Sequence, residues 1–317
     1  QITSEIIWGQ LQVISDILEL QNDENIAIIA TERSLQPHLP PKEYLESKCI
    51  RLNVGDDINL EELSKQLSEC GYVKTNSIDT EGTWSRRGDI LDIYPVSSEL
   101  PIRLELFGDQ LEKIKEFDPI SQRSLDKIEN IYITPTGFDP LIIDRLLSNK
   151  QTDICNLFTH EEYSELLVTH SLPTVKKYLG VAFEKPSSLL NYLNNTTFIV
   201  VDDRLQGISH GNAWHKIVSE SYNESISIRK DKLLNENNYK PNLHSEINIK
   251  YSELNSYNGF DISDLEDNSN KKNVFNISSK FHNWLPNQYG KISTTIKEYI
   301  KTNYSVWIIS AQPSRAV

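Results

Sequence analysis

The stretch GTWSRRGDILDIYPVSSELPIRLELFGDQLEKIKEF, residues 82–117, decides the fold of the first half of the chain. It consists of short segments in which apolar and polar side chains alternate, and Gly88, Pro95 and the pair Gly108-Asp109 separate them. A crossover between parallel strands needs about a dozen residues or more, whereas a hairpin turn needs only a few. The spacing therefore predicts an antiparallel meander, which continues outward over residues 72–134.

The segment PIRLELF (101–107) separates a core face from a charged face. Successive side chains of a strand point to opposite sides of the sheet. The side chains predicted for the core are Ile102, Leu104 and Leu106. The opposite face then carries Arg103, Glu105 and Phe107, with Arg87 at the turn before the preceding strand. Arginine and aromatic side chains are enriched at interfaces, although a solvated face with an Arg–Glu cross-pair explains the pattern as well.

The regions outside the meander have the character of an α/β protein. Apolar spacing predicts helices at 6–20, 59–70 and 292–301, and a helix in SSLLNYL (187–193). Apolar runs predict strands at 25–30, 49–54, 197–203 and 305–310. The polar, Asn-rich stretch from Tyr222 to Asn242 is predicted to be a linker or loop.

Composition narrows the class of protein. The chain has 317 residues, with 32 Lys and Arg against 45 Asp and Glu, so its formal net charge is −13. Proteins that coat DNA or membranes hold phosphates with clustered basic residues, which this balance disfavours. No apolar run approaches the roughly 20 residues that span a bilayer, and Cys49, Cys70 and Cys155 are too scattered for a disulfide framework. We therefore expect a cytoplasmic globular protein with buried thiols and about two domains, or three small ones.

Of the two motifs that usually form a nucleotide-binding site, the Walker B strand and the P-loop, the sequence shows a candidate for only the first. TFIVVDD (197–203) resembles a Walker B strand, in which Asp202 or Asp203 would hold Mg²⁺. The chain has one Gly-Lys pair, Gly290-Lys291, and Leu285 stands where the P-loop requires its first glycine. The simpler prediction is a buried strand that ends in solvated or capping acids. No metal site is predicted, because His210 and His215 are five residues apart and point to different sides of a helix.

Residues 82–125 closely resemble the UvrB-homology module of the bacterial transcription-repair coupling factor family (Mfd). The positions that carry the resemblance are Gly82, Trp84, Arg87, Gly88, Ile90, Leu91, Asp92, Ile93, Tyr94, Pro95, Pro101, Arg103, Glu105, Phe107, Phe117, Asp118, Ser121, Gln122, Arg123 and Ser124. One departure is Thr83, where the family usually has glutamate. Weaker similarity extends over nearly the whole chain.

The resemblance implies a particular domain order. A degenerate UvrB/RecA-like NTPase-type α/β domain, residues 1–48 and 136–225, is expected to be split by a small antiparallel β-rich α+β insert, residues 49–135. A polar linker (226–245) and a truncated α/β third domain (246–317) are expected to follow. In the family the RNA-polymerase-interacting domain and the ATP-dependent DNA translocase motor lie later. We therefore expect this chain not to be an enzyme and to need no cofactor. Binding of ATP and Mg²⁺, and contacts with RNA polymerase and DNA, are expected to belong to other domains of the family.

The resemblance also implies a partner. In the family the inserted β domain recruits UvrA for transcription-coupled nucleotide excision repair, in imitation of UvrB. Carried over position by position, the binding residues are Arg87, Arg103 and Phe107, with Glu105 and Arg123 as further contributors. Because Arg103 and Phe107 lie on a face predicted to be exposed, Arg103→Glu or Phe107→Ala is expected to weaken UvrA binding by more than about 1 kcal/mol and to leave thermal unfolding nearly unchanged.

Two alternatives stay open at the level of sequence. A P-loop upstream of Gln1 would make Asp202 and Asp203 part of a live, UvrB-like ATPase. A local basic face would allow direct contact with DNA, as UvrB makes, and such binding would be sensitive to salt.

Overall fold

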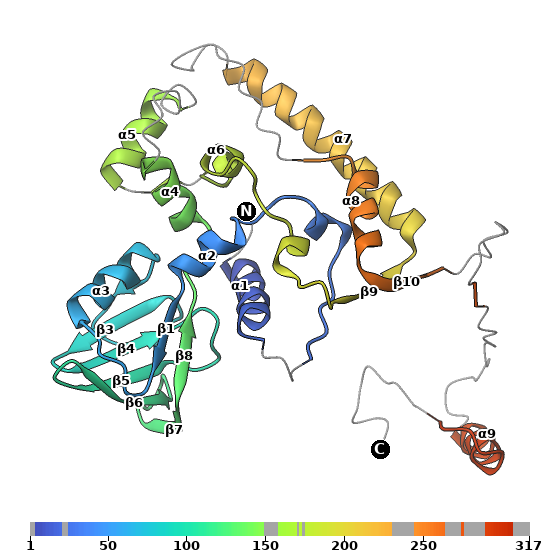
Figure 1. Cartoon of the computed structure of the whole chain (residues 1–317), viewed down its shortest axis with the longest axis horizontal. Coiled ribbons are helices and arrows are strands. Elements are labelled where there is room, and N and C mark those ends of the chain that lie inside the picture. Colours follow the sequence, from blue (N-terminus) through green and yellow to red (C-terminus); the bar gives the residue numbers. More distant parts are fainter. Residues whose placement is uncertain are drawn as a thin grey trace. The chain divides into compact units, whose positions relative to one another are not determined.

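The computed structural model describes residues 4–20, 25–148, 158–169, 171–172, 175–229, 244–263, 274–275 and 289–306. They belong to two compact units, Gln1–Asp264 and Leu265–Val317 (Figure 1). In the second unit the described part contains the helix α9 (Tyr289–Lys301), which confirms the helix predicted there. Within the described ranges, no helix is long and apolar enough to cross a membrane.

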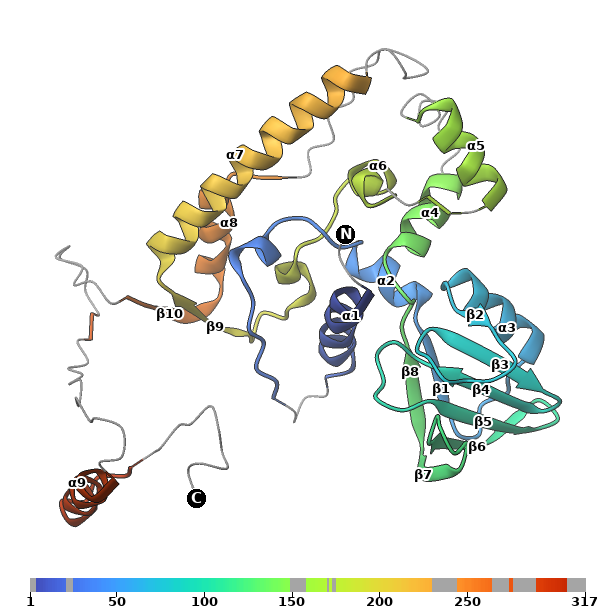
Figure 2. The same ribbon diagram turned by 180° about the vertical axis from the view of Figure 1, so that it is seen from behind.

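A six-stranded sheet forms the body of the insert, in the strand order β2-β3-β4-β5-β6-β7 (Figures 1 and 2). The strands are β2 (Val73–Lys74), β3 (Thr83–Arg87), β4 (Ile90–Tyr94), β5 (Ile102–Phe107), β6 (Gln110–Phe117) and β7 (Ser124–Ile128). From β3 to β7 each strand pairs antiparallel with the next, and β2 pairs parallel with β3. Gly88 and Gly108, with φ of 63° and 61°, make the two tight turns possible. The predicted meander is confirmed.

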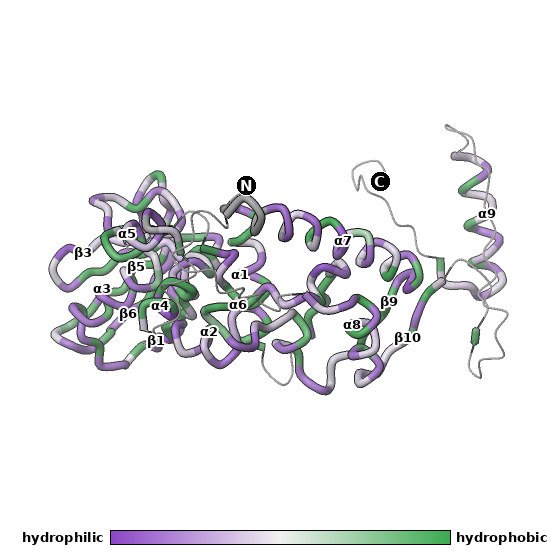
Figure 3. The backbone as a smooth tube through the Cα atoms, turned by 90° about the horizontal axis from the view of Figure 1, so that it is seen from above, coloured by the Kyte–Doolittle hydropathy of each residue, from purple (hydrophilic) through white to green (hydrophobic). Residues whose placement is uncertain are grey.

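Helix α3 (Leu60–Glu69) covers one face of this sheet. Its apolar residues Leu60, Leu63 and Leu67 recur at helical spacing, and all three are buried against the strands. The Asn59 side chain caps the helix by accepting the amide hydrogens of Glu61 and Glu62. The strand residues buried beneath the helix include Ile102, Leu104 and Leu106, as their alternation predicts. In Figure 3 the tube changes repeatedly between hydrophilic and hydrophobic colours along these strands.

Two antiparallel strands, β1 (Ile50–Asn53) and β8 (Asn130–Ile133), lead the chain into and out of the insert. Outside it, a helical core is built by α1 (Ser4–Glu19), α2 (Lys42–Lys48), α4 (Asp139–Ser148), α5 (His160–Thr169) and α6 (Leu179–Ala182), with the 3₁₀ turns η3 (Val175–Tyr178) and η4 (Leu189–Tyr192). The 3₁₀ turn η1 (Glu32–Leu35) contributes Leu35 to a second cluster, with Val201 and Ile247. The insert and the helical core are joined by side chains as well as by the chain, since the Cys70 thiol of the insert donates to the carbonyl of Lys48, the last residue of α2, at 3.2 Å.

The expected boundary at residue 246 differs from the division that the structure makes. Strand β9 (Phe198–Asp202) pairs in parallel with β10 (Asn258–Ile262), and α7 (Arg204–Arg229) packs with α8 (Ile247–Glu253), which the 3₁₀ turn η5 (Leu254–Ser256) follows. Pairing with β9 therefore keeps residues 247–262 in the first unit, and the boundary falls near Asp264.

Three smaller expectations also differ from the structure. Residues 25–30 form no strand, and Ile29 is 101% exposed, because β9 pairs with β10 and no described strand pairs with this segment. SSLLNYL contains only the short turn η4 rather than an α-helix. The first part of the expected linker, up to Arg229, continues α7, while residues 230–243 lie outside the described ranges. The strand expected at 305–310 lies largely outside them too.

Glu162 joins the start of α5 to the turn η3. Its amide donates to Thr159 Oγ1 at 3.2 Å, and its carboxylate accepts the Thr159 amide at 3.0 Å, which is a reciprocal helix cap. The carboxylate also accepts hydrogen bonds from Lys177 and, at 2.9 Å, from the Tyr178 hydroxyl. Burial opposes ionisation, but the hydrogen bonds outweigh it and lower the pKa of Glu162 to about 2.

The Glu162 carboxylate is expected to make the free energy of unfolding depend on pH in the acidic range. The pKa of Glu162 in the folded state lies below the ordinary value of 4.5. Its contribution to the free energy of unfolding is therefore complete above pH 4.5 and is lost as the pH falls toward 2. Glu162→Gln is expected to flatten this part of the profile and to cost about 1 kcal/mol at neutral pH, a figure discounted for solvent screening. Urea unfolding across this pH range measures both effects. Glu161→Gln, one residue away and exposed, is the control, and an equal change in both variants would contradict the assignment.

Candidate protein-docking site

The sheet face opposite α3 carries the side chains predicted to bind a partner, and we call it the outer face. Strand register arranges it in two rows. The first row runs Arg87, Ile90, Glu105, Lys113 across β3 to β6, and the second runs Ser85, Asp92, Arg103, Lys115 across the same strands. Phe107 follows Glu105 on β5, at the end of the sheet where the first row lies. The structure therefore places Arg103, Glu105 and Phe107 on one face, as alternation predicts, and strand register adds Arg87, which ends β3, to the same face.

Arg103 is held in place by a carboxylate. Its Nε and Nη2 donate to the two oxygens of Asp92 at 2.7 and 2.9 Å, so the pair is bidentate. The Asp92 residue is only 6% exposed, and the Arg103 guanidinium also lies 4.8 Å from the centre of the Phe117 ring. The hydrogen bond with Asp92 raises the pKa of Arg103 above its already high ordinary value. Arg103 therefore supports the sheet as well as presenting charge, and it is not the freely solvated side chain that the sequence suggested.

Glu105 is also paired within the face. Its carboxylate accepts a hydrogen bond from Lys115 at 2.5 Å and lies 4.0 Å from the Lys113 ammonium. Both carboxylates of the two rows, Asp92 and Glu105, are thus matched by cations of the same face. Since the rows hold four cations and two anions, the face has a cationic excess on a chain whose sum is −13.

The open end of the outer face is apolar and cationic. Phe107 is 76% exposed, and Ile90, its diagonal neighbour across the β4–β5 pair, is also exposed. Arg87 lies at the same end, opposite Ile90 in the β3–β4 pair, and its Nη2 donates to the Asn76 carbonyl at 2.8 Å. A large exposed aromatic with an aliphatic and a guanidinium beside it has the composition of an interface hot spot.

Arg123 lies elsewhere. It is exposed in the turn between β6 and β7, outside the two rows, and its carbonyl accepts the Asp118 amide. Conversely, Ile90, Lys113 and Lys115 belong to the face although sequence reasoning did not name them. Alternation within 90–94 and 110–117 contained part of the signal. The register that brings these strands beside Arg103 includes an irregularity between Glu105 and Leu106, which alternation does not reveal.

Asp202 and Asp203 lie between the end of β9 and the start of α7. Asp203, at φ 43°, caps α7 by accepting the Gln206 amide at 3.1 Å, and its own amide donates to the Ile262 carbonyl. Asp202 ends β9 and is exposed. Within the described ranges no group of three or more His, Cys, Asp or Glu side chains is placed to hold a metal ion. For Asp203 the prediction of a capping acid is confirmed, but the prediction of a buried strand is wrong, because Phe198 and Val200 of β9 are 60% and 48% exposed.

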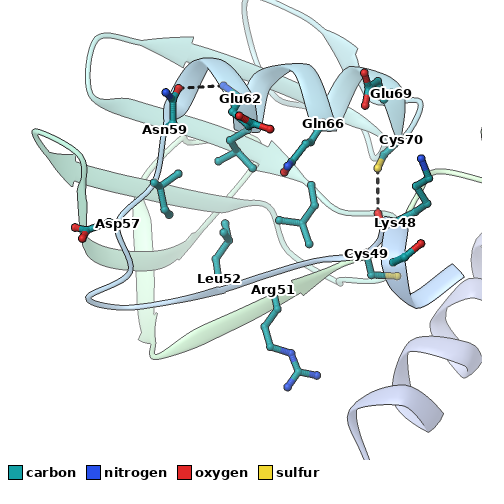
Figure 4. A pocket seen from close by; sticks show the side chains of 14 residues that line it. Lys48, Cys49, Arg51, Leu52, Asp57, Asn59, Glu62, Gln66, Glu69 and Cys70 are labelled. Atoms are coloured by element: carbon teal, nitrogen blue, oxygen red, sulfur yellow. Dashed lines mark hydrogen bonds between the residues drawn. The ribbon is translucent and has the colours of Figure 1, made fainter. Parts of the chain in front are cut away.

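A groove of about 500 Å³ lies between α3 and β1, away from the outer face (Figure 4). Cys49 and Cys70 lie at one end of it, and the Cys70 thiol donates to the Lys48 carbonyl at 3.2 Å. Burial raises the pKa of Cys49 to about 11 and that of Cys70 to about 12, so both stay protonated at neutral pH. The buried thiol expected from the sequence is confirmed for Cys70, whereas Cys49 is half-buried and Cys155 lies outside the described ranges.

Comparison with known proteins agrees with this geometry. Residues 50–137 match the UvrB interaction domain, and residues 281–317 match a domain described as the Rossmann-like domain of cyanobacterial Mfd. The transcription-repair-coupling factor of Bacillus subtilis is 30% identical over 226 residues, which are 64% of this chain and 19% of that protein. The factor of Staphylococcus haemolyticus is 28% identical over 226 residues, with the same two shares.

The chain thus spans about a fifth of the length of these relatives, and one family domain coincides with the sheet that carries the outer face. The chain is thus similar to part of the transcription-repair-coupling factors, and the similarity includes their UvrB interaction domain.

Proposed function

We propose that the chain is a non-catalytic adaptor that docks UvrA through the outer face during transcription-coupled nucleotide excision repair. The observation that carries the proposal is Phe107, 76% exposed on a rigid strand within a UvrB interaction domain. An aromatic ring at an interface centre, once buried, contributes a large share of binding free energy. Ile90 widens the apolar area, and Arg87 supplies a guanidinium at its edge.

Charge pairing on the outer face favours an acidic partner surface. Asp92 is paired with Arg103, and Glu105 with the two lysines of β6, so four cations less two anions leave the two rows a net charge of +2, with Arg87 outside these pairs. Complementary charge accelerates association and suppresses wrong partners more than it adds affinity. We infer that the UvrA surface offers an apolar pocket for Phe107 with carboxylates around it.

The remainder of the first unit serves as a scaffold in this proposal. The capping role of Asp203 accounts for the acids of the Walker B-like strand without nucleotide chemistry. We assign ATP-driven translocation, and contacts with RNA polymerase and DNA, to parts of the longer protein beyond these 317 residues.

Arg87→Ala is expected to lower the affinity of the chain for UvrA about tenfold, because it removes an exposed guanidinium beside Phe107. Titration calorimetry with purified UvrA measures the change. The control is Arg86→Ala: Arg86 is the same residue type and exposed, but it pairs with the core residue Leu91 and so points to the other face.

The two variants separate the outer face from charge in general. An equal loss of UvrA affinity in Arg87→Ala and Arg86→Ala would show that the effect comes from the net charge of the chain. Full affinity in Arg87→Ala, together with full affinity in Phe107→Ala, would place the UvrA site elsewhere on the chain.

A further inference from the structure

A loop between β2 and β3, residues 75–82, folds over the outer face: Asn76 contacts Arg87, and Ile78 packs at the end of the face opposite Phe107. Ile78 from this loop is 1% exposed and packs with Tyr94 of β4 and Phe117 of β6. We call these three residues the loop cluster. It is separate from the main core of the insert, which lies on the other side of the sheet beneath α3.

Gln122 ties this loop down from the turn between β6 and β7. Its Nε2 donates to the Ile78 carbonyl at 2.9 Å and to the Pro119 carbonyl at 2.7 Å. The backbone of Gln122 has φ 58°, a conformation that glycine or asparagine adopts more readily. The turn is closed independently by Asp118, whose Oδ1 accepts the Ser121 amide at 2.6 Å. The side chain of Gln122 is therefore not needed to make the turn, but it does connect the turn to the loop.

The tied loop meets both arginines of the outer face. The Asn76 carbonyl, two residues before Ile78, accepts the hydrogen bond from Arg87 Nη2. Phe117 of the loop cluster lies under the Arg103 guanidinium. Arg103 is also fixed by Asp92, whereas Asn76 supplies the hydrogen bond that orients Arg87. A loop that moves would therefore release Arg87 more than Arg103.

We propose that Gln122 is a positioning residue for UvrA docking: it latches the 75–82 loop and so holds the Arg87 guanidinium in a binding conformation. This inference rests on the proposed docking of UvrA through the outer face. An exposed arginine loses rotamer entropy when it binds, and a side chain ordered beforehand loses less. The latch thus adds affinity without touching the partner.

Gln122→Gly tests the latch without straining the turn, because glycine accepts positive φ at no steric cost. UvrA affinity is expected to fall about fivefold through lost preorganisation, while the thermal midpoint changes little. Amide hydrogen exchange of Ser77–Asp79 is expected to become faster, and the Nε–Hε resonance of Arg87 in NMR spectra to sharpen as the side chain gains mobility. A purely structural role would move the thermal midpoint instead of these local signals.

Gln122→Asn is the second variant, since asparagine also tolerates positive φ but is one methylene too short to keep both carbonyl contacts. It is expected to behave like the glycine variant. Ile120→Ser, at a 93% exposed position of the same turn, is the control and should bind like the unmodified chain.

A double-mutant cycle identifies the residue through which Gln122 acts. In an Arg87→Ala background, Gln122→Gly is expected to cost almost nothing more, whereas in a Phe107→Ala background its cost should stay near fivefold. Equal cost in both backgrounds, or unchanged loop exchange, would overturn the latch. If Phe107→Ala and Arg87→Ala weaken UvrA binding but Gln122→Gly does not, the latch alone fails; if none of the three does, the docking proposal itself fails.

Discussion

Phe107→Ala is expected to reduce the affinity for UvrA by about 30-fold or more, which corresponds to about 2 kcal/mol for loss of a buried aromatic anchor. The ring is 76% exposed in the free chain, so its removal takes little from the folded state. The thermal midpoint should therefore stay within about 2 °C of the unmodified chain, as for other exposed positions.

Titration calorimetry and thermal unfolding of the same samples test both parts. Phe260→Ala is the matched control, because Phe260 is also an exposed strand phenylalanine but lies on β10, outside the insert. Unchanged affinity in Phe107→Ala would remove the centre of the proposed interface. A large fall in its thermal midpoint would show instead that the ring supports the fold.

Arg103→Glu is expected to destabilise the insert by about 3–5 kcal/mol, the range for breaking a buried ion pair. The substitution leaves Asp92 without its bidentate partner and sets a second carboxylate opposite it in the sheet. It also removes the cation over Phe117. The structure thus changes the expectation that Arg103→Glu leaves unfolding untouched, because that expectation took the side chain to be solvated.

Urea unfolding measures this loss, with Arg87→Glu as the control on the same face. A double variant, Asp92→Leu with Arg103→Met, replaces the pair by apolar side chains and is expected to recover most of the stability. If that variant folds but binds UvrA more weakly than the unmodified chain, Arg103 contributes to docking as well as to the sheet. An unfolding curve of Arg103→Glu that matches the unmodified chain would show that the pair is energetically neutral.

Local patterns predicted much of the insert. Alternation in 101–107 placed Leu104 in the core and Phe107 outside, and a helix was predicted at 59–70, where α3 forms. These features depend on neighbours in the chain, because strand alternation and helix spacing are properties of the backbone itself. The part of the outer face that β5 forms, with Arg103, Glu105 and Phe107, therefore followed from the sequence.

Pairing between strands that lie far apart in the chain was harder to predict from local sequence patterns. Residues 25–30 have the composition of a buried strand but are exposed, whereas residues 258–262, for which no strand was predicted, pair with β9. Whether an apolar segment becomes a strand depends on which other strand reaches it, and that partner lies far away in the chain. For the same reason, the boundary near Asp264 could not be predicted from the sequence.

The sequence by itself determined that residues 72–134 form an antiparallel meander and that Arg103, Glu105 and Phe107 share one face, because turn residues and period-2 alternation act over a few residues. Only the tertiary structure decided what each of these side chains is free to do. Register across strands pairs Arg103 with the buried Asp92 and Glu105 with two lysines, and a loop tied by Gln122 orients Arg87. Phe107 is left exposed, since no other part of the first unit covers that end of the sheet within the described ranges.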